Sequence, residues 1–191
     1  MRLDPTAPDM TLFLVMLHTG TMFAVIVYFW RSWRATYFQS PKAFRSNGLL
    51  VVVATAATGV IGFALLKLIG RLFAASSPGF EIEHLFGSTK LIATGLACAG
   101  VLILVSSRKA NLSGDVTLRS SLAIGAVQGL CLPFRGLSRS GATISTGLLS
   151  GAIRRRAEEF SFALAVVLTP AVIAREGYRF YKAYAVSGHG E

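Results

Sequence analysis

The sequence contains little charge and few acidic residues. Only 15% of its 191 residues are charged, 53% are hydrophobic, and the mean hydropathy is +0.58. Soluble domains usually carry about 25% charged residues, so this composition argues against one. The two cysteines, Cys98 and Cys131, lack the paired spacing of a zinc site or a disulfide framework. The N-terminus also lacks the basic and then apolar pattern of a cleaved signal peptide.

Long apolar runs take the place of the missing charge. Residues 11–30, 48–66 and 91–107 contain no lysine, arginine, aspartate or glutamate. A helix of about 20 apolar residues crosses a hydrocarbon core of roughly 30 Å, so these runs predict transmembrane helices. The alternative is a soluble helical bundle. Its helices would show a polar stripe at helical spacing, and these runs show none.

The basic residues are grouped between the apolar runs. The net charge of +10 could indicate nucleic-acid binding, but residues 31–45 hold four basic residues and no acid, which predicts a cytoplasmic link. Residues 75–87 hold two glutamates and no lysine or arginine, which predicts an external loop. A last apolar run, 160–174, contains Pro170 and precedes a basic tail, so its topology stays open. We predict an all-α polytopic membrane protein with about four spans, in one membrane domain over 1–191.

A polar centre interrupts the apolar stretch at 121–153. The segment RGLSRSG (135–141) separates two apolar pieces, each too short to cross a bilayer comfortably, and three arginines follow at 154–156. These features predict a re-entrant helical hairpin. Irregular backbone at membrane depth must be covered by protein or line a polar cavity, so this centre is the expected site.

Two arginines, Arg135 and Arg139, lie in this hairpin, which contains no carboxylate. Each costs roughly 2.5 to 3.5 kcal/mol to insert, so such residues usually pair with a counter-charge or handle an anion. Close packing of small residues explains Gly147, Ser150 and Gly151, but not the charge of Arg139. The donors around it predict an anion site: Ser138, Ser140, Gly141 and Thr143.

The stretch GLSRSGATIS (136–145) resembles the signature of the undecaprenyl-diphosphate phosphatase family, the bacitracin-resistance phosphatases. The segments QG (128–129), EFSFALAV (159–166) and LHTG (17–20) are also similar to that family, so the resemblance covers most of the chain. It implies hydrolysis of undecaprenyl diphosphate to undecaprenyl phosphate and inorganic phosphate in the bacterial inner membrane. This reaction recycles the carrier lipid of peptidoglycan synthesis and confers bacitracin resistance. The implied architecture is an inverted repeat with two re-entrant loops.

The resemblance also implies roles for individual residues. Arg139 would bind the diphosphate and Ser138 would act beside it, as a donor or as the nucleophile. Arg135 stands where the family commonly has proline, and would make a second phosphate contact or bond to a cytoplasmic carbonyl. The other residues implied to line the substrate pocket are Ser140, Gly141, Thr143 and Gln128.

Two further ionisable residues have open roles. His18 lies inside the first apolar run, where it would serve the site or bond to a neighbouring helix. Glu159 would contact substrate or simply favour the helix start that follows the arginine triplet.

One family feature is missing from the sequence. Family members carry an N-terminal half-motif with two glutamates four residues apart and a following Ser-Ser-Thr-Gly-His run, and this chain has neither that segment nor the last spans of the family. We therefore expect a piece of a larger domain that is weak or inactive by itself. A divalent cation, magnesium or calcium, would use oxygen ligands that we cannot identify in this chain.

Partners follow from the same reasoning. We expect the polyprenyl diphosphate lipid and the bilayer as partners, a possible homodimer, and no nucleic acid. A transporter or flippase that binds an anionic lipid headgroup at the hairpin without cleaving it is the alternative function, since broken helices also mark transport sites.

Overall fold

The computed structural model describes residues 8–74, 89–108, 113–134 and 136–187. Arg135, a predicted site residue, lies outside them, and so does the predicted external loop at 75–87. His18 falls within a helix, but its side chain is not among those described.

The described chain is helical throughout. The described residues contain no strand, only an isolated bridge between Gly114 and Ala152. This confirms the predicted all-α class. The helices are α1 (Pro8–Tyr37), α2 (Pro41–Ala74), α4 (Thr89–Ser107), α5 (Leu118–Cys131), α6 (Arg139–Leu149) and α7 (Arg154–Ser187).

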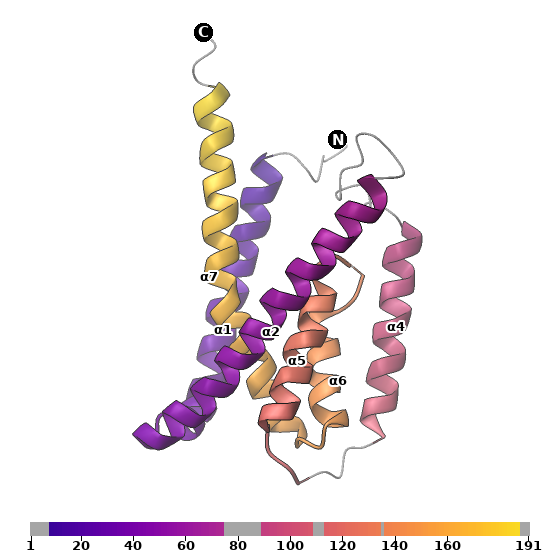
Figure 1. Cartoon of the computed structure of the whole chain (residues 1–191). Helices are drawn as coiled ribbons and strands as arrows, with labels where there is room; N and C mark the ends of the chain where they lie inside the picture. Colours follow the sequence, from indigo (N-terminus) through magenta and orange to yellow (C-terminus); the bar gives the residue numbers. More distant parts are fainter. Residues whose placement is uncertain (1–7, 75–88, 109–112, 135, 188–191) are drawn as a thin grey trace.

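The long helices share one basic end. Figure 1 shows α1 ending where α2 and α7 begin, while the start of α1 and the end of α7 lie at the opposite end of the molecule. The basic residues of 31–45 and the arginine triplet at 154–156 therefore gather at one end, as the positive-inside pattern predicts for a cytoplasmic side. Since α7 runs through Pro170 as one helix, the basic tail lies at the other end.

Within the described residues, three helices are long and apolar enough to cross a membrane: Pro41–Leu72, Thr89–Ser107 and Arg154–Ala174. The first two contain the predicted spans 48–66 and 91–107, and the third contains the run whose topology was open. Large apolar side chains such as Val27, Phe63 and Leu104 are more than half exposed. Lipid provides the apolar surroundings that these side chains need, so the chain is a polytopic membrane protein.

The predicted hairpin is formed by α5 and α6. At 1.5 Å per residue, these helices of 14 and 11 residues are about 21 Å and about 17 Å long, too short to cross a bilayer. Figure 1 shows them side by side, with the turn between them part-way along α4 and α7.

Local sequence sets the ends of both short helices. Thr117 caps α5 by accepting from the Ser120 amide at 3.2 Å, while its own amide donates to Ser120 Oγ at 2.7 Å. The buried Pro133 follows the end of α5. Gly151, with φ of +98°, follows α6 and turns the chain into α7.

Small residues allow α2 and α5 to approach closely. A Cβ on Gly125 would lie 2.2 Å from the Ala54 carbonyl oxygen, and one on Gly129 would lie 2.9 Å from the Thr58 carbonyl oxygen. Thr58 Oγ1 donates to the Gly125 carbonyl at 2.9 Å, so a hydrogen bond reinforces the contact. Close approach through small residues is common where helices pack in membranes.

The fully buried apolar residues sit where α2, α5, α6 and α7 meet. Ala54, Ile124, Ala157 and Leu164 have no exposed surface. They form one cluster with Val51, Val116, Leu148, Ala152 and Phe160. This cluster fixes the hairpin against a long helix on each side.

The close contact of α2 and α5 predicts a specific sensitivity. Gly125→Ala should destabilise the protein by roughly 1 to 3 kcal/mol, because the new methyl group overlaps backbone that cannot move away freely. Thermal unfolding in detergent, followed by circular dichroism, measures this. Gly59→Ala is the control, since a Cβ there meets nothing within 4 Å, and it should leave stability unchanged or slightly raised. Equal behaviour of the two variants would contradict the close packing.

Candidate anion site at the hairpin tip

The turn between α5 and α6 is pressed against α4. A Cβ on Gly136 would lie 2.1 Å from the Ile92 carbonyl oxygen, and one on Gly95 would lie 2.9 Å from the Gly136 carbonyl carbon. Only glycine fits at these two positions without a shift of the backbone. Gly136 of the motif therefore allows the hairpin tip to contact α4 closely. The sequence analysis did not identify the matching Gly95, because its partner lies 41 residues away in the chain.

Ser138 and Arg139 open α6. Ser138 is the N-cap, and its Oγ accepts from the Gly141 amide at 3.2 Å. The hydroxyl proton of Ser138 remains available to a ligand. The amides of Arg139 and Ser140 belong to the first turn and have no intrahelical partner, so the positive end of α6 lies at the tip.

The Arg139 side chain is partly buried, and its guanidinium has no hydrogen-bond or ion-pair partner within the described part of the chain. The described carboxylates that form ion pairs, those of Asp115, Glu158 and Glu159, all pair with the arginine triplet instead. A partly buried charge without a counter-charge is unfavourable, so the tip is a candidate site for an anion.

Thr143 is buried and links helices. Its Oγ1 donates to the Arg139 carbonyl at 2.8 Å and lies 2.6 Å from Ser161 Oγ on α7. A second hydroxyl pair, Ser106 to Ser145 at 3.0 Å, links α4 to α6. These contacts hold the first turn of α6 in place. A direct contact between Thr143 and substrate stays a prediction.

Gln128 and Ser140 differ in their surroundings. Gln128 is 1% exposed on α5, and its Oε1 has no hydrogen-bond partner among the described residues. An unsatisfied buried acceptor requires a donor, such as a water or a ligand. Ser140 is exposed in the first turn of α6. Both stay predicted substrate contacts.

Glu159 lies in a separate polar cluster at the basic end. Its carboxylate accepts from Ser32 Oγ, from Arg155 Nε at 2.8 Å and from Arg156 Nη1 at 2.9 Å, and the side chain is 1% exposed. The Trp33 indole donates to the Glu159 carbonyl at 3.1 Å. The structure therefore ties Glu159 to α1, and does not bring it together with Ser138 and Arg139.

Arg156 is the hub of this cluster. Besides Glu159, its guanidinium bonds Asp115 at 2.7 Å, Thr36 at 3.0 Å and Asn47 at 3.2 Å, so it joins α1, α2, α7 and the segment before α5. Burial raises the pKa of the neighbouring Tyr37 to about 12, although the charge of Arg156 opposes this effect. Tyr37 therefore stays neutral at physiological pH. From the sequence, the arginine triplet indicates only the topology and gives no sign of these structural contacts.

Together these features define a class: a membrane protein in which two half-length helices form a hairpin, whose tip carries a helix N-terminus and a guanidinium with no partner among the described residues. The chain belongs to the family described as bacitracin resistance protein BacA, which matches residues 1–189. The family resemblance stated from the motif is thereby confirmed.

Relatives agree with this assignment. The chain is 59% identical over 190 residues to undecaprenyl-diphosphatase 2 of Acinetobacter baylyi, covering 98% of this chain and 67% of the relative. It is 34% identical over 203 residues to an undecaprenyl-diphosphatase of Acidiphilium cryptum, covering 97% of this chain and 67% of that one. A third, from Korarchaeum cryptofilum, is 33% identical over 169 residues, covering 81% of this chain and 58% of the relative. The chain thus spans about two thirds of the length of the first two.

The basic-end cluster generates a stability prediction. Arg156→Gln should destabilise the protein by roughly 3 kcal/mol, because it leaves the buried Glu159 with one guanidinium fewer and separates Asp115 from α7. Thermal unfolding in detergent measures the loss. Arg154→Gln is the matched control: its side chain is 73% exposed and pairs only with Glu158, so the expected change is below about 1 kcal/mol. If Arg154→Gln lowered the stability as much as Arg156→Gln does, the assignment of Arg156 as the centre of the cluster would be contradicted.

Proposed function

We propose that this protein hydrolyses undecaprenyl diphosphate to undecaprenyl phosphate and inorganic phosphate, and that the hairpin tip binds the diphosphate. The observation that carries the proposal is the unpaired guanidinium of Arg139 at the N-terminus of α6, in a chain of the BacA family. The names of the relatives support the same substrate.

Each part of the tip has a chemical task in this proposal. Arg139 holds phosphate oxygens with paired hydrogen bonds and neutralises the charge that develops as the anhydride bond breaks. The free amides of the first turn of α6 add donors at the positive helix end. The Ser138 hydroxyl lies next to them, where it donates to a phosphate oxygen or supplies the attacking oxygen.

The reaction consumes one water molecule, and the proton that the attacking hydroxyl group loses passes to a phosphate oxygen. The attacking oxygen, from water or from Ser138, forms a bond to the terminal phosphorus. The bond from that phosphorus to the bridging oxygen breaks, and its electron pair leaves with undecaprenyl phosphate. With Ser138 as nucleophile, water then releases inorganic phosphate from the serine ester. Positioning and charge neutralisation are the main contributions that a protein makes to such a transfer.

A divalent cation remains part of the proposal, but the described residues do not provide its site. They contain no group of three or more histidine, cysteine, aspartate or glutamate side chains able to hold a metal ion. The carboxylates of Asp115, Glu158 and Glu159 are occupied by arginines. We derive no step through a metal for these residues, and magnesium or calcium would need ligands from outside them.

The cellular setting follows from the substrate. We place the protein in the bacterial inner membrane, where hydrolysis returns the carrier lipid to peptidoglycan synthesis and confers resistance to bacitracin. We also propose that two copies of this membrane domain form a homodimer.

Replacing Arg139 tests the proposal. The assay uses membranes with this chain joined to the segments of the Acinetobacter relative that it does not align with, so that the protein has the length of the relative. Arg139→Ala should lower phosphate release from undecaprenyl diphosphate by about 100-fold or more, because it removes the main charge that stabilises the transition state.

The control for this variant is Arg119→Ala. Arg119 is exposed in the first turn of α5, and its loss should leave phosphate release near that of the wild type. Unchanged hydrolysis in Arg139→Ala would refute the site. Movement of the lipid between leaflets without phosphate release, dependent on Arg139, would instead support the transporter alternative, which the half-length helices of the hairpin also allow.

Gln128 offers a second test that separates function from folding. Gln128→Met keeps the side-chain volume close to that of glutamine and removes a buried acceptor that has no partner among the described residues. Stability should therefore stay the same or rise by about 1 kcal/mol. If Oε1 accepts from substrate or from the attacking water, phosphate release should fall by about 10-fold at the same time. Loss of stability with full activity would show a structural role only.

A further inference from the structure

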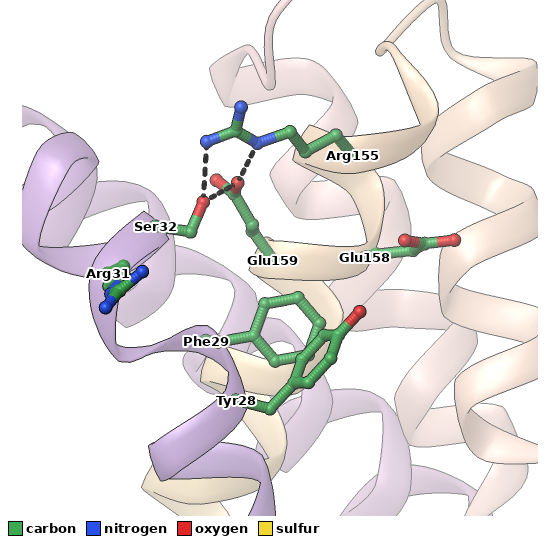
Figure 2. Close-up of a pocket in the computed structure, with 7 residues that line it drawn as sticks. All are labelled: Tyr28, Phe29, Arg31, Ser32, Arg155, Glu158 and Glu159. Carbon is green, nitrogen blue, oxygen red and sulfur yellow. Dashed lines mark hydrogen bonds and ion pairs between the residues drawn. The ribbon is translucent and has the colours of Figure 1, made fainter.

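A polar pocket lies between α1 and α7, at the basic end and apart from the hairpin tip. Its volume is about 370 Å³, and residues of both helices line it. Figure 2 shows Ser32 on α1 facing Arg155 and Glu159 on α7, with the rings of Tyr28 and Phe29 below them, and Arg31 of α1 also lines the pocket. Neither Ser138 nor Arg139 belongs to this pocket.

Two guanidinium groups give the pocket its capacity for an anion. Arg155 donates from Nε to Glu159 and from Nη2 to Ser32 Oγ at 2.9 Å, so its Nη1 and a second Nη2 hydrogen stay available on a side chain that is 71% exposed. The Arg31 side chain is exposed and has no hydrogen-bond or ion-pair partner in the described ranges. An anion between the two helices can therefore meet donors from both.

The carboxylates of the pocket do not oppose an anion. Glu159 is 1% exposed, and its charge is balanced by Arg155 and Arg156. Glu158 pairs with Arg154 at 2.9 Å, and Figure 2 shows its carboxylate pointing away from Ser32 and Arg155. The cluster around the pocket then holds four guanidinium groups, those of Arg31 and the triplet, against three carboxylates.

An aromatic surface connects the pocket to lipid. Phe29 stacks on Trp33 of α1 and on Phe162 of α7, with ring centroids 5.8 Å and 5.1 Å apart. Tyr28 is 80% exposed and Val27, the residue before it on α1, is 78% exposed. A ligand that fills the pocket thus has an anionic end beside the arginines and an apolar surface leading into the bilayer.

We infer that this pocket binds the phosphate headgroup of an anionic glycerophospholipid of the leaflet at the basic end. Basic pockets between membrane helices on the cytoplasmic side are suited to such headgroups, because they combine charge with lateral access from lipid. Free phosphate shares the headgroup chemistry but lacks acyl chains for the aromatic surface. The lipid would bridge α1 and α7 next to the buried Glu159 cluster.

The test measures lipid retention rather than catalysis. The 191-residue chain is placed in nanodiscs with equal amounts of phosphatidylglycerol and phosphatidylcholine, released with mild detergent, and weighed with its bound lipids by native mass spectrometry. The wild type should retain phosphatidylglycerol in preference to phosphatidylcholine. Arg31→Gln should lower that preference by about fivefold, the effect of one basic residue at an anionic lipid surface. Excess inorganic phosphate should not displace the lipid.

Arg34→Gln is the matched control, since it removes the same charge from the same helix end, is exposed and does not line the pocket. It should keep the wild-type preference. Circular dichroism checks that both variants fold, which is expected because neither guanidinium has a partner among the described residues. Equal retention of the two lipids, an equal loss in Arg34→Gln, or displacement by inorganic phosphate would each overturn the inference.

Discussion

The guanidinium of Arg139, which has no counter-charge among the described residues, lies inside an apolar hairpin and is the constraint around which this protein is arranged. Arg139 could have been neutralised by a carboxylate, yet the described carboxylates that form ion pairs are all engaged at the basic end. Because an unpaired, partly buried charge is unfavourable, the rest of the fold must offset its cost. The half-length of α5 and α6 puts a helix N-terminus part-way along the long helices rather than at a membrane surface.

Rigidity at the tip comes from backbone contacts and hydroxyl pairs. Gly95 and Gly136 let α4 touch the turn directly, and Gly125 lets α2 touch α5. The pairs Thr143 with Ser161 and Ser106 with Ser145 then fix α6 between α7 and α4. In lipid, where apolar attraction between helices is weak, close packing and hydrogen bonds of this kind hold helices together.

At the basic end, the arginines that indicate the topology also hold the helices together. Arg156 gathers Asp115, Glu159, Thr36 and Asn47, and so joins elements that are more than 100 residues apart in the chain. The same arginine triplet that predicts a cytoplasmic side is thus a structural centre. The other two arginines, Arg154 and Arg155, remain exposed, and beside Arg155 the pocket between α1 and α7 opens toward an aromatic surface.

The sequence by itself determined the apolar helices, the basic side, the broken hairpin at 121–153 and the place of Ser138 and Arg139 at its polar centre. These features depend on composition and local order: the length of an apolar run, the place of its charges, and a serine that caps the helix it precedes. Only the tertiary structure decided that α7 runs unbroken through Pro170, that Gly95 meets Gly136, and that Glu159 turns toward α1. Those outcomes depend on which distant surfaces meet. No local pattern encodes them, because each is fixed by the steric fit or the charge of a partner far away in the chain.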